Sequence, residues 1–150
     1  MLTRLSNTPR DYAWGSTTLI AELEGRAPSG APEAEVWLGD HPGSPARVED
    51  GSGRTLDDVL GAGERLPYLL KLLAAASALS IQAHPSKEQA ERGFAEEDAA
   101  GVPVDAAHRN YRDDNHKPEV IVALRDGFEA LSGLRDLGAF LRREVAVGQS

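Results

Sequence analysis

The chain has 150 residues, of which 41% are hydrophobic and 27% charged, and its formal net charge at pH 7 is −8. This length suits one domain or a piece of one, and the acidic balance argues against a general nucleic-acid or anionic-membrane surface. Cysteine is absent, which excludes disulfides and thiolate metal sites, and without a signal peptide or a long apolar run we expect a cytoplasmic protein.

The first half of the chain alternates apolar pieces with turn residues. AEVWLG (34–39) predicts a strand, because apolar and β-branched residues are followed there by a turn-rich stretch. TLDDVLGA (55–62) predicts one or two helical turns with Thr55 as the N-cap. LPYLLKLLAAASALSIQAH (66–84) predicts two buried strands joined near residues 75–77, although its Leu and Ala content would also suit a helix.

The second half begins with a clear helix signal. Ser86 and Gln89 have the spacing of a capping box, so PSKEQAERGFAEED (85–98) predicts a helix and the polar residues 99–115 predict a loop. KPEVIVAL (117–124) predicts a strand with Pro118 near its start, and LRDLGAFLRREVAV (134–147) predicts the beginning of a helix. Short strands between turns, with brief helices, favour an antiparallel β-sandwich or barrel.

Gln82 and His84 interrupt an apolar segment with two polar side chains. In a strand they share one face, because successive side chains alternate. Together with the carboxylate of Glu119, they would offer oxygen and nitrogen ligands suited to Zn²⁺, Mn²⁺ or Fe²⁺ with open coordination. By spacing alone, a single Q-x-H pair is more often structural than metal-binding.

Other polar and aromatic residues leave similar alternatives. NHKPE (115–119) crowds polar side chains against an apolar strand, and a solvated loop is the simpler interpretation. Lys71 inside PYLLKLLAA must extend to solvent, pair with an acid or line a pocket. Trp14 and Trp37 read as core or pocket-lining aromatics, and Glu35 as an ordinary exposed carboxylate.

Six segments together resemble the type I phosphomannose isomerases, which are zinc-dependent enzymes of the cupin superfamily: YAWGS, AEVWLGDHPGSPA, LPYLLKLL, LSIQAHPSK, RGFAEE and NYRDDNHKPEVIVAL. They follow the family's order and spacing over almost the whole chain. The resemblance implies a mainly β fold, a cupin-like jelly-roll or β-sandwich with short helices that forms an incomplete barrel. Residues 1–134 would be the N-terminal part of the catalytic domain, and residues 135–150 the truncated beginning of a helical segment.

The resemblance also implies roles for individual residues. One zinc ion would be held by Gln82, His84 and Glu119, with a fourth protein ligand, a histidine, expected outside this chain. Lys117 and His116 are the candidates for catalytic proton transfer. The residues implied to contact a sugar phosphate are Lys71, Ser80, Trp14 and Glu35.

The implied activity is the interconversion of mannose 6-phosphate and fructose 6-phosphate. The chain would be an N-terminal portion that can be inactive alone, with a C-terminal half or a second chain completing the barrel. The alternatives are a non-catalytic cupin module that binds a metal or a phosphosugar, and one subunit of a split isomerase. No nucleic-acid or membrane partner is expected.

Overall fold

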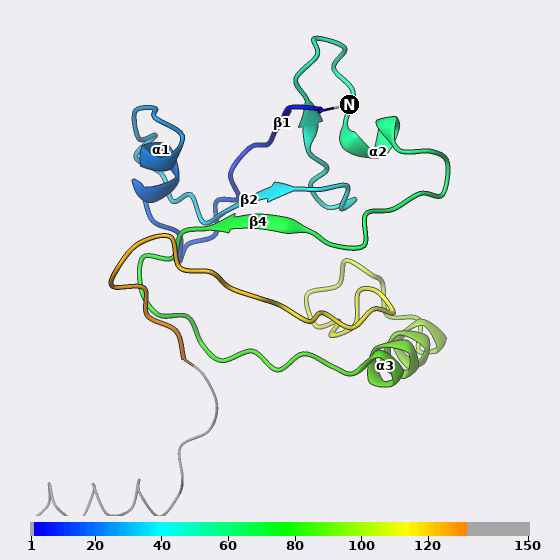
Figure 1. Ribbon diagram of the computed structural model, residues 1–150. Coiled ribbons are helices and arrows are strands. Elements are labelled where there is room, and N and C mark those ends of the chain that lie inside the picture. Colours follow the sequence, from blue (N-terminus) through cyan, green and yellow to red (C-terminus); the bar gives the residue numbers. More distant parts are fainter. Residues whose placement is uncertain (1, 132–150) are drawn as a thin grey trace, which may run out of the picture. The chain divides into compact units, whose positions relative to one another are not determined.

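The computed structural model describes residues 2–131 (Figure 1). The chain divides between Leu79 and Ser80 into two compact units. The elements of the first unit are β1 (Leu5–Ser6), α1 (Leu19–Leu23), β2 (Glu35–Leu38), β3 (Arg47–Val48), α2 (Leu56–Val59) and β4 (Leu70–Leu73). The second unit contains α3 (Lys87–Ala99).

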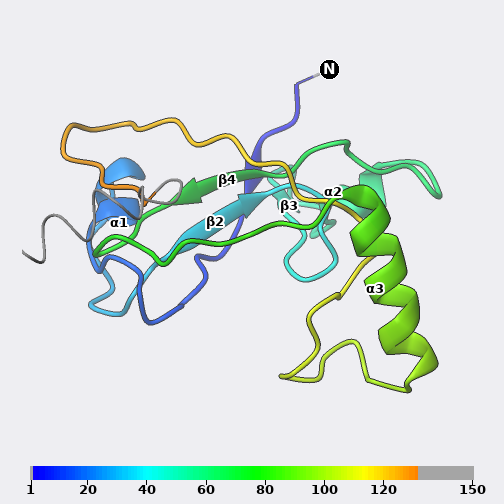
Figure 2. The same ribbon diagram turned by 90° about the horizontal axis from the view of Figure 1, so that it is seen from below.

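The main sheet of the first unit pairs β2 with β4 in antiparallel register. Glu35 lies opposite Leu73, and Trp37 lies opposite Lys71; Figures 1 and 2 both show the two strands side by side. A smaller antiparallel pair joins β1 to β3, with Leu5 opposite Val48. The predicted strand at AEVWLG is confirmed as β2, and the first of the two strands predicted within 66–84 is confirmed as β4.

The backbone around Gly15 extends this sheet by a close approach. The Ser16 N–H donates to the Ala74 carbonyl at 2.7 Å, so the chain lies directly beside the end of β4. A Cβ at Gly15 would lie 2.6 Å from the backbone nitrogen of Ala34, a distance that real Cβ atoms do not adopt. Position 15 therefore requires glycine, and next to it the Trp14 carbonyl accepts the Ala76 N–H at 2.9 Å.

The buried core of the first unit is small. Its packed cluster contains the buried residues Ile20, Val36 and Ala74, against which Leu19, Leu38 and Leu72 pack. These contacts hold α1 on the β2–β4 sheet, and full burial of a side chain such as Ile20 stabilises the fold by roughly 1.5–3 kcal/mol. The expectation that β4 is buried is wrong, because Leu70 is 55% exposed and Leu73 37% exposed; within the strand, Leu72 is the residue that packs against the core cluster.

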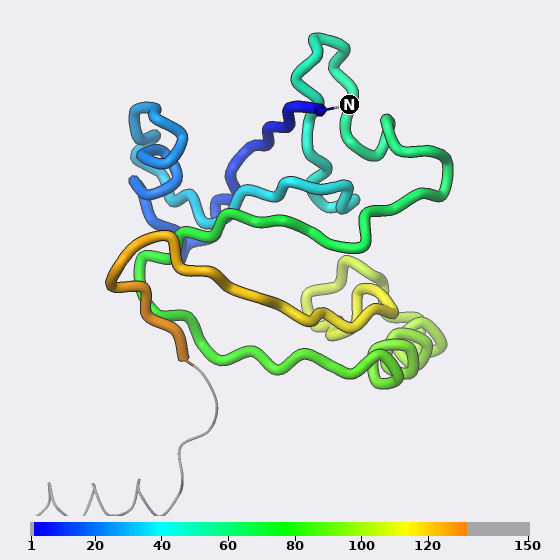
Figure 3. Tube along the Cα trace, viewed as in Figure 1, coloured from blue at the N-terminus to red at the C-terminus, as the bar shows by residue number. Residues whose placement is uncertain are grey.

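The two predicted helices with caps are confirmed. Thr55 is the N-cap of α2, and Ser86 is the N-cap of α3. Ser86 Oγ accepts the Gln89 N–H at 3.3 Å and Gln89 Oε1 accepts the Ser86 N–H at 2.9 Å, which is the reciprocal bonding of a capping box. Figure 3 traces how the chain enters α3 along residues 80–86 and turns back through residues 100–116.

Two predicted strands are not formed. Residues 80–84 and 117–124 belong to no helix or strand, and Ile81 is 53% exposed and Val120 91% exposed. A strand requires a hydrogen-bonded neighbour, and no backbone hydrogen bond joins residues 118–124 to any other described residue. These extended segments keep the apolar sequence of strands without the pairing that defines them.

The prediction of a mainly β fold is therefore confirmed only in part. Within residues 2–131 the strands are two to four residues long, whereas α3 has 13 residues. The helix predicted at 134–147 and the boundary at 134/135 lie outside the described residues. Among the residues described, no helix has both the length and the apolar character needed to cross a bilayer.

Candidate functional site

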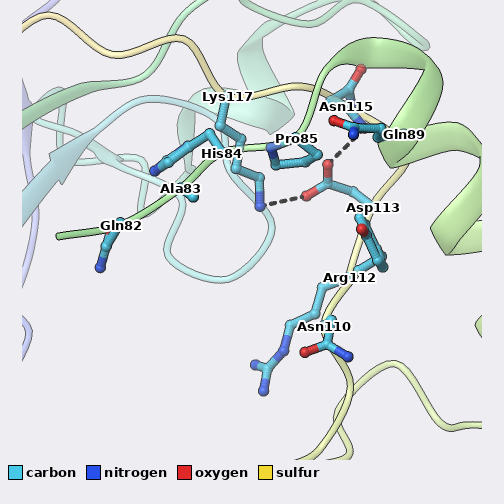
Figure 4. A pocket seen from close by; sticks show the side chains of 11 residues that line it. Gln82, Ala83, His84, Pro85, Gln89, Asn110, Arg112, Asp113, Asn115 and Lys117 are labelled. Carbon is cyan, nitrogen blue, oxygen red and sulfur yellow. Dashed lines mark hydrogen bonds and ion pairs between the residues drawn. The ribbon is translucent and has the colours of Figure 1, made fainter. Parts of the chain in front are cut away.

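A pocket of about 600 Å³ lies in the second unit (Figure 4). Three of the residues singled out from the sequence line it: Gln82, His84 and Lys117. The other lining residues are Ala83, Pro85, Gln89, Asn110, Tyr111, Arg112, Asp113 and Asn115. One wall thus comes from the segment that enters α3 and the other from the loop that follows α3, so the pocket gathers residues about thirty positions apart in the sequence.

Gln82 and His84 reach the pocket without the strand geometry predicted for them. Ala83 lines the same pocket, so the alternation of faces expected in a strand is not seen here. The reason is that residues 80–85 have no strand neighbour to impose a pleat. Both polar side chains are exposed, and Figure 4 shows them on the chain segment that leads into the helix.

Lys117 is oriented by a carboxylate of its own loop. Its Nζ lies 3.1 Å from Asp113 Oδ2, and the other Asp113 oxygen accepts the Asn115 N–H at 2.9 Å; both interactions are drawn in Figure 4. The Lys117 side chain remains 52% exposed. The ammonium group is therefore paired and held at the pocket while solvent or a ligand can still reach it.

Glu119 and His116 do not line this pocket. Both are exposed, in a stretch that belongs to no helix or strand. Within residues 2–131, no cluster of three or more His, Asp or Glu side chains is placed to hold a metal ion. Gln82 and His84 nevertheless supply an amide oxygen and an imidazole nitrogen at one pocket, two donors that suit zinc.

Lys71 belongs to a polar cluster in the first unit. Its Nζ lies 4.8 Å from the centroid of the Trp37 ring and 3.9 Å from Glu35 Oε1. Glu35 Oε2 accepts the Trp37 Nε1–H at 2.8 Å. The interpretation of Glu35 as an ordinary exposed carboxylate is wrong, since the residue is 8% exposed; a buried carboxylate requires such partners.

Trp14 and Ser80 lie outside these two clusters. Trp14 stacks on Tyr12, with ring centroids 5.7 Å apart, and Ser80 is an exposed residue at the start of the second unit. The sequence reasoning missed Arg10, whose guanidinium carbon lies 5.3 Å from the centroids of both Tyr12 and Trp37. No local pattern marks this arginine, because its partners depend on how the sheet folds.

The sequence reasoning also missed two charged partners of this loop. Asp113 lies four positions before Lys117 and pairs with it at 3.1 Å, although residues 110–117 form no helix, so the helical rule for this spacing gave no signal. Lys87 binds the same loop, with its Nζ 2.8 Å from the Asp114 carbonyl oxygen. Desolvation lowers the pKa of Lys87, but the hydrogen bond to Glu91 and the charge of Asp114 outweigh it and raise the pKa overall, so this lysine keeps its charge beside the loop.

Comparison with known proteins shows an extended match. Residues 2–137 match the family described as "Phosphomannose isomerase type I, catalytic domain". The chain is 46% identical over 149 residues to a mannose-6-phosphate isomerase of Escherichia coli (strain K12), covering 89% of this chain and 38% of that protein. It is 33% identical over 154 residues to a mannose-6-phosphate isomerase of Candida albicans, covering 85% of this chain and 32% of that protein.

Solved structures give the same match. A crystal structure of mannose 6-phosphate isomerase from Salmonella typhimurium, bound to fructose 6-phosphate and zinc, is 46% identical in sequence with a TM-score of 0.67. The similarity covers 77% of this chain and 33% of that chain. The present chain thus spans less than two fifths of the length of these relatives.

Proposed function

The chain belongs to the type I phosphomannose isomerase family, and from this membership we propose that it forms the N-terminal part of a zinc-dependent isomerase acting on mannose 6-phosphate and fructose 6-phosphate. The observation that carries the proposal is the pocket at which Gln82, His84 and Lys117 meet. Each of the three lies in a motif shared with the family, LSIQAHPSK or NHKPE, and their convergence does not follow from sequence proximity.

Zinc is proposed because the donor set fits and relatives have been solved with it. Gln82 and His84 would hold the ion, and Glu119 is proposed as the third ligand, with the fourth supplied by polypeptide outside these 150 residues. A bound zinc ion with an open position would polarise the oxygens of the sugar. For Glu119 to join the other two, the exposed segment after Pro118 must turn its carboxylate toward the pocket.

Lys117 is proposed as the group that handles charge or protons in the reaction. Aldose–ketose interconversion moves a proton between C1 and C2 through an enediol-like intermediate, so a positioned base or an oxyanion-stabilising cation is needed. The Lys117 ammonium is held by Asp113 at 3.1 Å and stays accessible at the pocket. His116, its neighbour, is the second candidate for proton transfer.

Lys71 and Ser80 are proposed to bind the phosphate group of the substrate, with Trp14 and Glu35 beside the sugar. Lys71 supplies a cation and Ser80 a hydroxyl donor, the two kinds of group that recognise phosphate oxygens. Lys71 is suited to this role because its Nζ is 3.9 Å from Glu35 rather than in a short ion pair, and its side chain is 32% exposed. A phosphate dianion can therefore compete for it.

The remainder of the fold is proposed to be a cupin-like barrel completed by further polypeptide, either a C-terminal half or a second chain. The chain spans 38% of the length of the Escherichia coli relative. Val120, Val122 and Leu124 are 91%, 74% and 71% exposed, which is the expected state of strand residues whose neighbours are not present. Residues 1–134 as the N-terminal part of the catalytic domain, and a cytoplasmic location, stay predictions.

The test measures turnover and zinc on the same samples. Isomerase activity is followed by coupling to glucose 6-phosphate formation, for the 150-residue chain alone and for a longer polypeptide that supplies the rest of the family fold. The proposal expects turnover in the longer polypeptide with one zinc per active site. One zinc per chain with no turnover in either sample would favour the alternative, a metal-binding or phosphosugar-binding module without catalysis.

A further inference from the structure

Arg109 is a fully enclosed charged side chain of the second unit, with 0% of the side chain exposed. Its guanidinium donates to three different acceptors, and its carbon lies 4.8 Å from the centroid of Phe94. Nε donates to the Tyr111 carbonyl at 2.6 Å, Nη2 donates to Asp98 Oδ1 at 2.7 Å, and Nη1 donates to the Val102 carbonyl. Burying an arginine is costly unless its donors are paired in this way.

Glu97 binds the same loop from the neighbouring position of α3. One carboxylate oxygen accepts the Asn110 N–H at 3.0 Å, and the other accepts the Tyr111 N–H at 2.8 Å. These backbone donors hold the pKa of Glu97 below its ordinary value. The carboxylate also lies 3.7 Å from Arg109 Nε, so the helix and the loop share one network of charges and backbone groups.

Gly93 allows the loop to lie directly on the helix. It is a buried residue of α3, and a Cβ at this position would overlap the Tyr111 ring. The ring therefore packs where the helix has no side chain. This contact adds a packing constraint to the hydrogen bonds of Glu97 and Arg109 at the same point of the loop.

Residues 110–117, which follow Arg109, form one side of the pocket and are called the wall below. Between residues 110 and 117, six of the eight line it, and none belongs to a helix or strand. Their order depends on Asp113, which binds Asn115 and Lys117, and on Lys87 at the start of α3, which binds Asp114 and Asn115. The wall is thus attached to α3 near both ends of the helix.

We infer that Arg109 and Glu97 are positioning residues, which fix residues 110–117 on α3 and so set where Lys117 lies in the pocket. A loop without regular structure otherwise leaves its side chains free to move, and small displacements of a reacting group lower its effectiveness strongly. Neither residue lines the pocket. The inference rests on the proposed function only for the chemical role of Lys117 in the pocket, and not for its position.

The experiment compares two isosteric variants of adjacent helix residues in the 150-residue chain. Glu97→Gln keeps the shape of the side chain but removes the charge that binds the loop. Glu96→Gln is the matched control, because Glu96 is 71% exposed on the same helix and its nearest charged partner is Arg92 at 3.9 Å. Helix content by circular dichroism establishes that each variant is folded, a check that the more disruptive Arg109→Ala could fail.

The deciding readout is the backbone order parameter of residues 112–117, measured by ¹⁵N relaxation. We expect values near 0.85 in the wild type and in Glu96→Gln, and values approaching about 0.6 in Glu97→Gln. If the Glu97 hydrogen bonds ordered only the residues that they contact, their loss would lower the order parameters of residues 110 and 111 alone. Unchanged order parameters at residues 112–117 in Glu97→Gln would overturn the inference.

A binding measurement separates this inference from the proposed function. Fructose 6-phosphate is titrated into the zinc-loaded longer polypeptide carrying each substitution, and we expect affinity to fall several-fold with Glu97→Gln but not with Glu96→Gln. If that longer polypeptide, without substitution, binds neither zinc nor fructose 6-phosphate, the proposed function fails, and the relaxation data on the 150-residue chain still decide whether the wall is positioned. Suppose that both variants bind fructose 6-phosphate equally well while the wall is mobile in Glu97→Gln. That result would refute the inference that an ordered wall is needed for the affinity of the ligand.

Discussion

Lys71 and Trp37 are opposite each other in the β2–β4 register, and Lys71 Nζ lies 4.8 Å from the centroid of the Trp37 indole ring. A cation over an aromatic face at this distance is attracted by the negative electrostatic potential of the ring. The same indole donates its N–H to Glu35. One tryptophan thus orients the cation and the carboxylate that are both proposed to contact substrate.

Replacing the charge of Lys71 tests its role in phosphate binding. We expect Lys71→Met to weaken fructose 6-phosphate binding by about tenfold or more, because hydrogen bonds to charged groups contribute about 1.5–3 kcal/mol. Isothermal titration calorimetry on the assembly that binds the sugar phosphate measures the change. Lys71→Arg, which keeps the charge, serves as the control and retains most of the affinity. Equal affinity in Lys71→Met would remove Lys71 from the phosphate site.

The proposed zinc ligands are tested by metal content. Gln82→Ala and His84→Ala are each expected to lower zinc affinity by at least about tenfold, since loss even of a group that supports a ligand costs about 10–100-fold. His108→Ala is the matched control, because His108 is exposed and does not line the pocket. Zinc is quantified after dialysis against a competing chelator. Wild-type zinc content in both pocket variants would contradict the ligand assignment.

Lys117 should matter for turnover and not for metal binding. In the polypeptide that shows isomerase activity, Lys117→Ala is expected to lower kcat by about 10²–10⁴-fold, the usual contribution of a positioned acid or base. Its ion pair with Asp113 is half-exposed, so folding stability should fall by no more than about 1 kcal/mol. Steady-state rates, zinc content and thermal unfolding are measured together. A wild-type rate would exclude Lys117 from the mechanism.

Gly93→Ala is predicted to have opposite effects on folding stability with and without the Tyr111 ring. Gly to Ala inside a helix ordinarily stabilises by about 1 kcal/mol, yet Gly93→Ala is expected to lower the free energy of unfolding by about 1–3 kcal/mol, because the new methyl group overlaps the Tyr111 ring. Chemical denaturation measures the change. In a Tyr111→Ser background the same substitution should become stabilising, and an equal destabilisation in both backgrounds would show that the ring is not the cause.

The stability supplied by Glu97 should depend on pH. Because its folded-state pKa is lowered from 4.5 by the N–H groups of Asn110 and Tyr111, its contribution is complete above the unfolded-state value. It is lost as the pH falls through the folded-state pKa. Arg109 and Asp98 are the charged groups beside it.

We expect the free energy of unfolding of the wild type to exceed that of Glu97→Gln at about pH 6, and the difference to shrink toward about pH 3. Denaturant unfolding at a series of pH values gives this difference, with Glu96→Gln measured alongside. A difference between wild type and Glu97→Gln that stays constant across the series would contradict the assignment of the lowered pKa to folding stability.

Features encoded over a few residues were predictable from the sequence. The capping box of Ser86 and Gln89, the N-cap at Thr55 and the strand at Glu35–Leu38 each depend on neighbouring positions, and each was predicted correctly. The motifs LSIQAHPSK and NHKPE also pointed to Gln82, His84 and Lys117, which the structure places at one pocket.

Features that need a distant partner were not predictable in the same way. The apolar residues of 117–124 suit a strand, but pairing depends on a neighbour that residues 2–131 do not supply. The burial of Glu35 depends on Trp37 and Lys71, which meet only when β2 pairs with β4. For the same reason, no local pattern marked Arg109 as the centre of the loop network.

The exposed run from Val120 to Leu124 has a consequence for how the protein behaves at high concentration. Its five residues are uncharged and rich in β-branched side chains, a composition that promotes intermolecular stacking into fibrils. Glu119 and Arg125 flank the run as gatekeeper charges that oppose such stacking. Neutralising either one by substitution, as in Glu119→Gln or Arg125→Gln, should therefore lower the concentration at which the chain begins to aggregate.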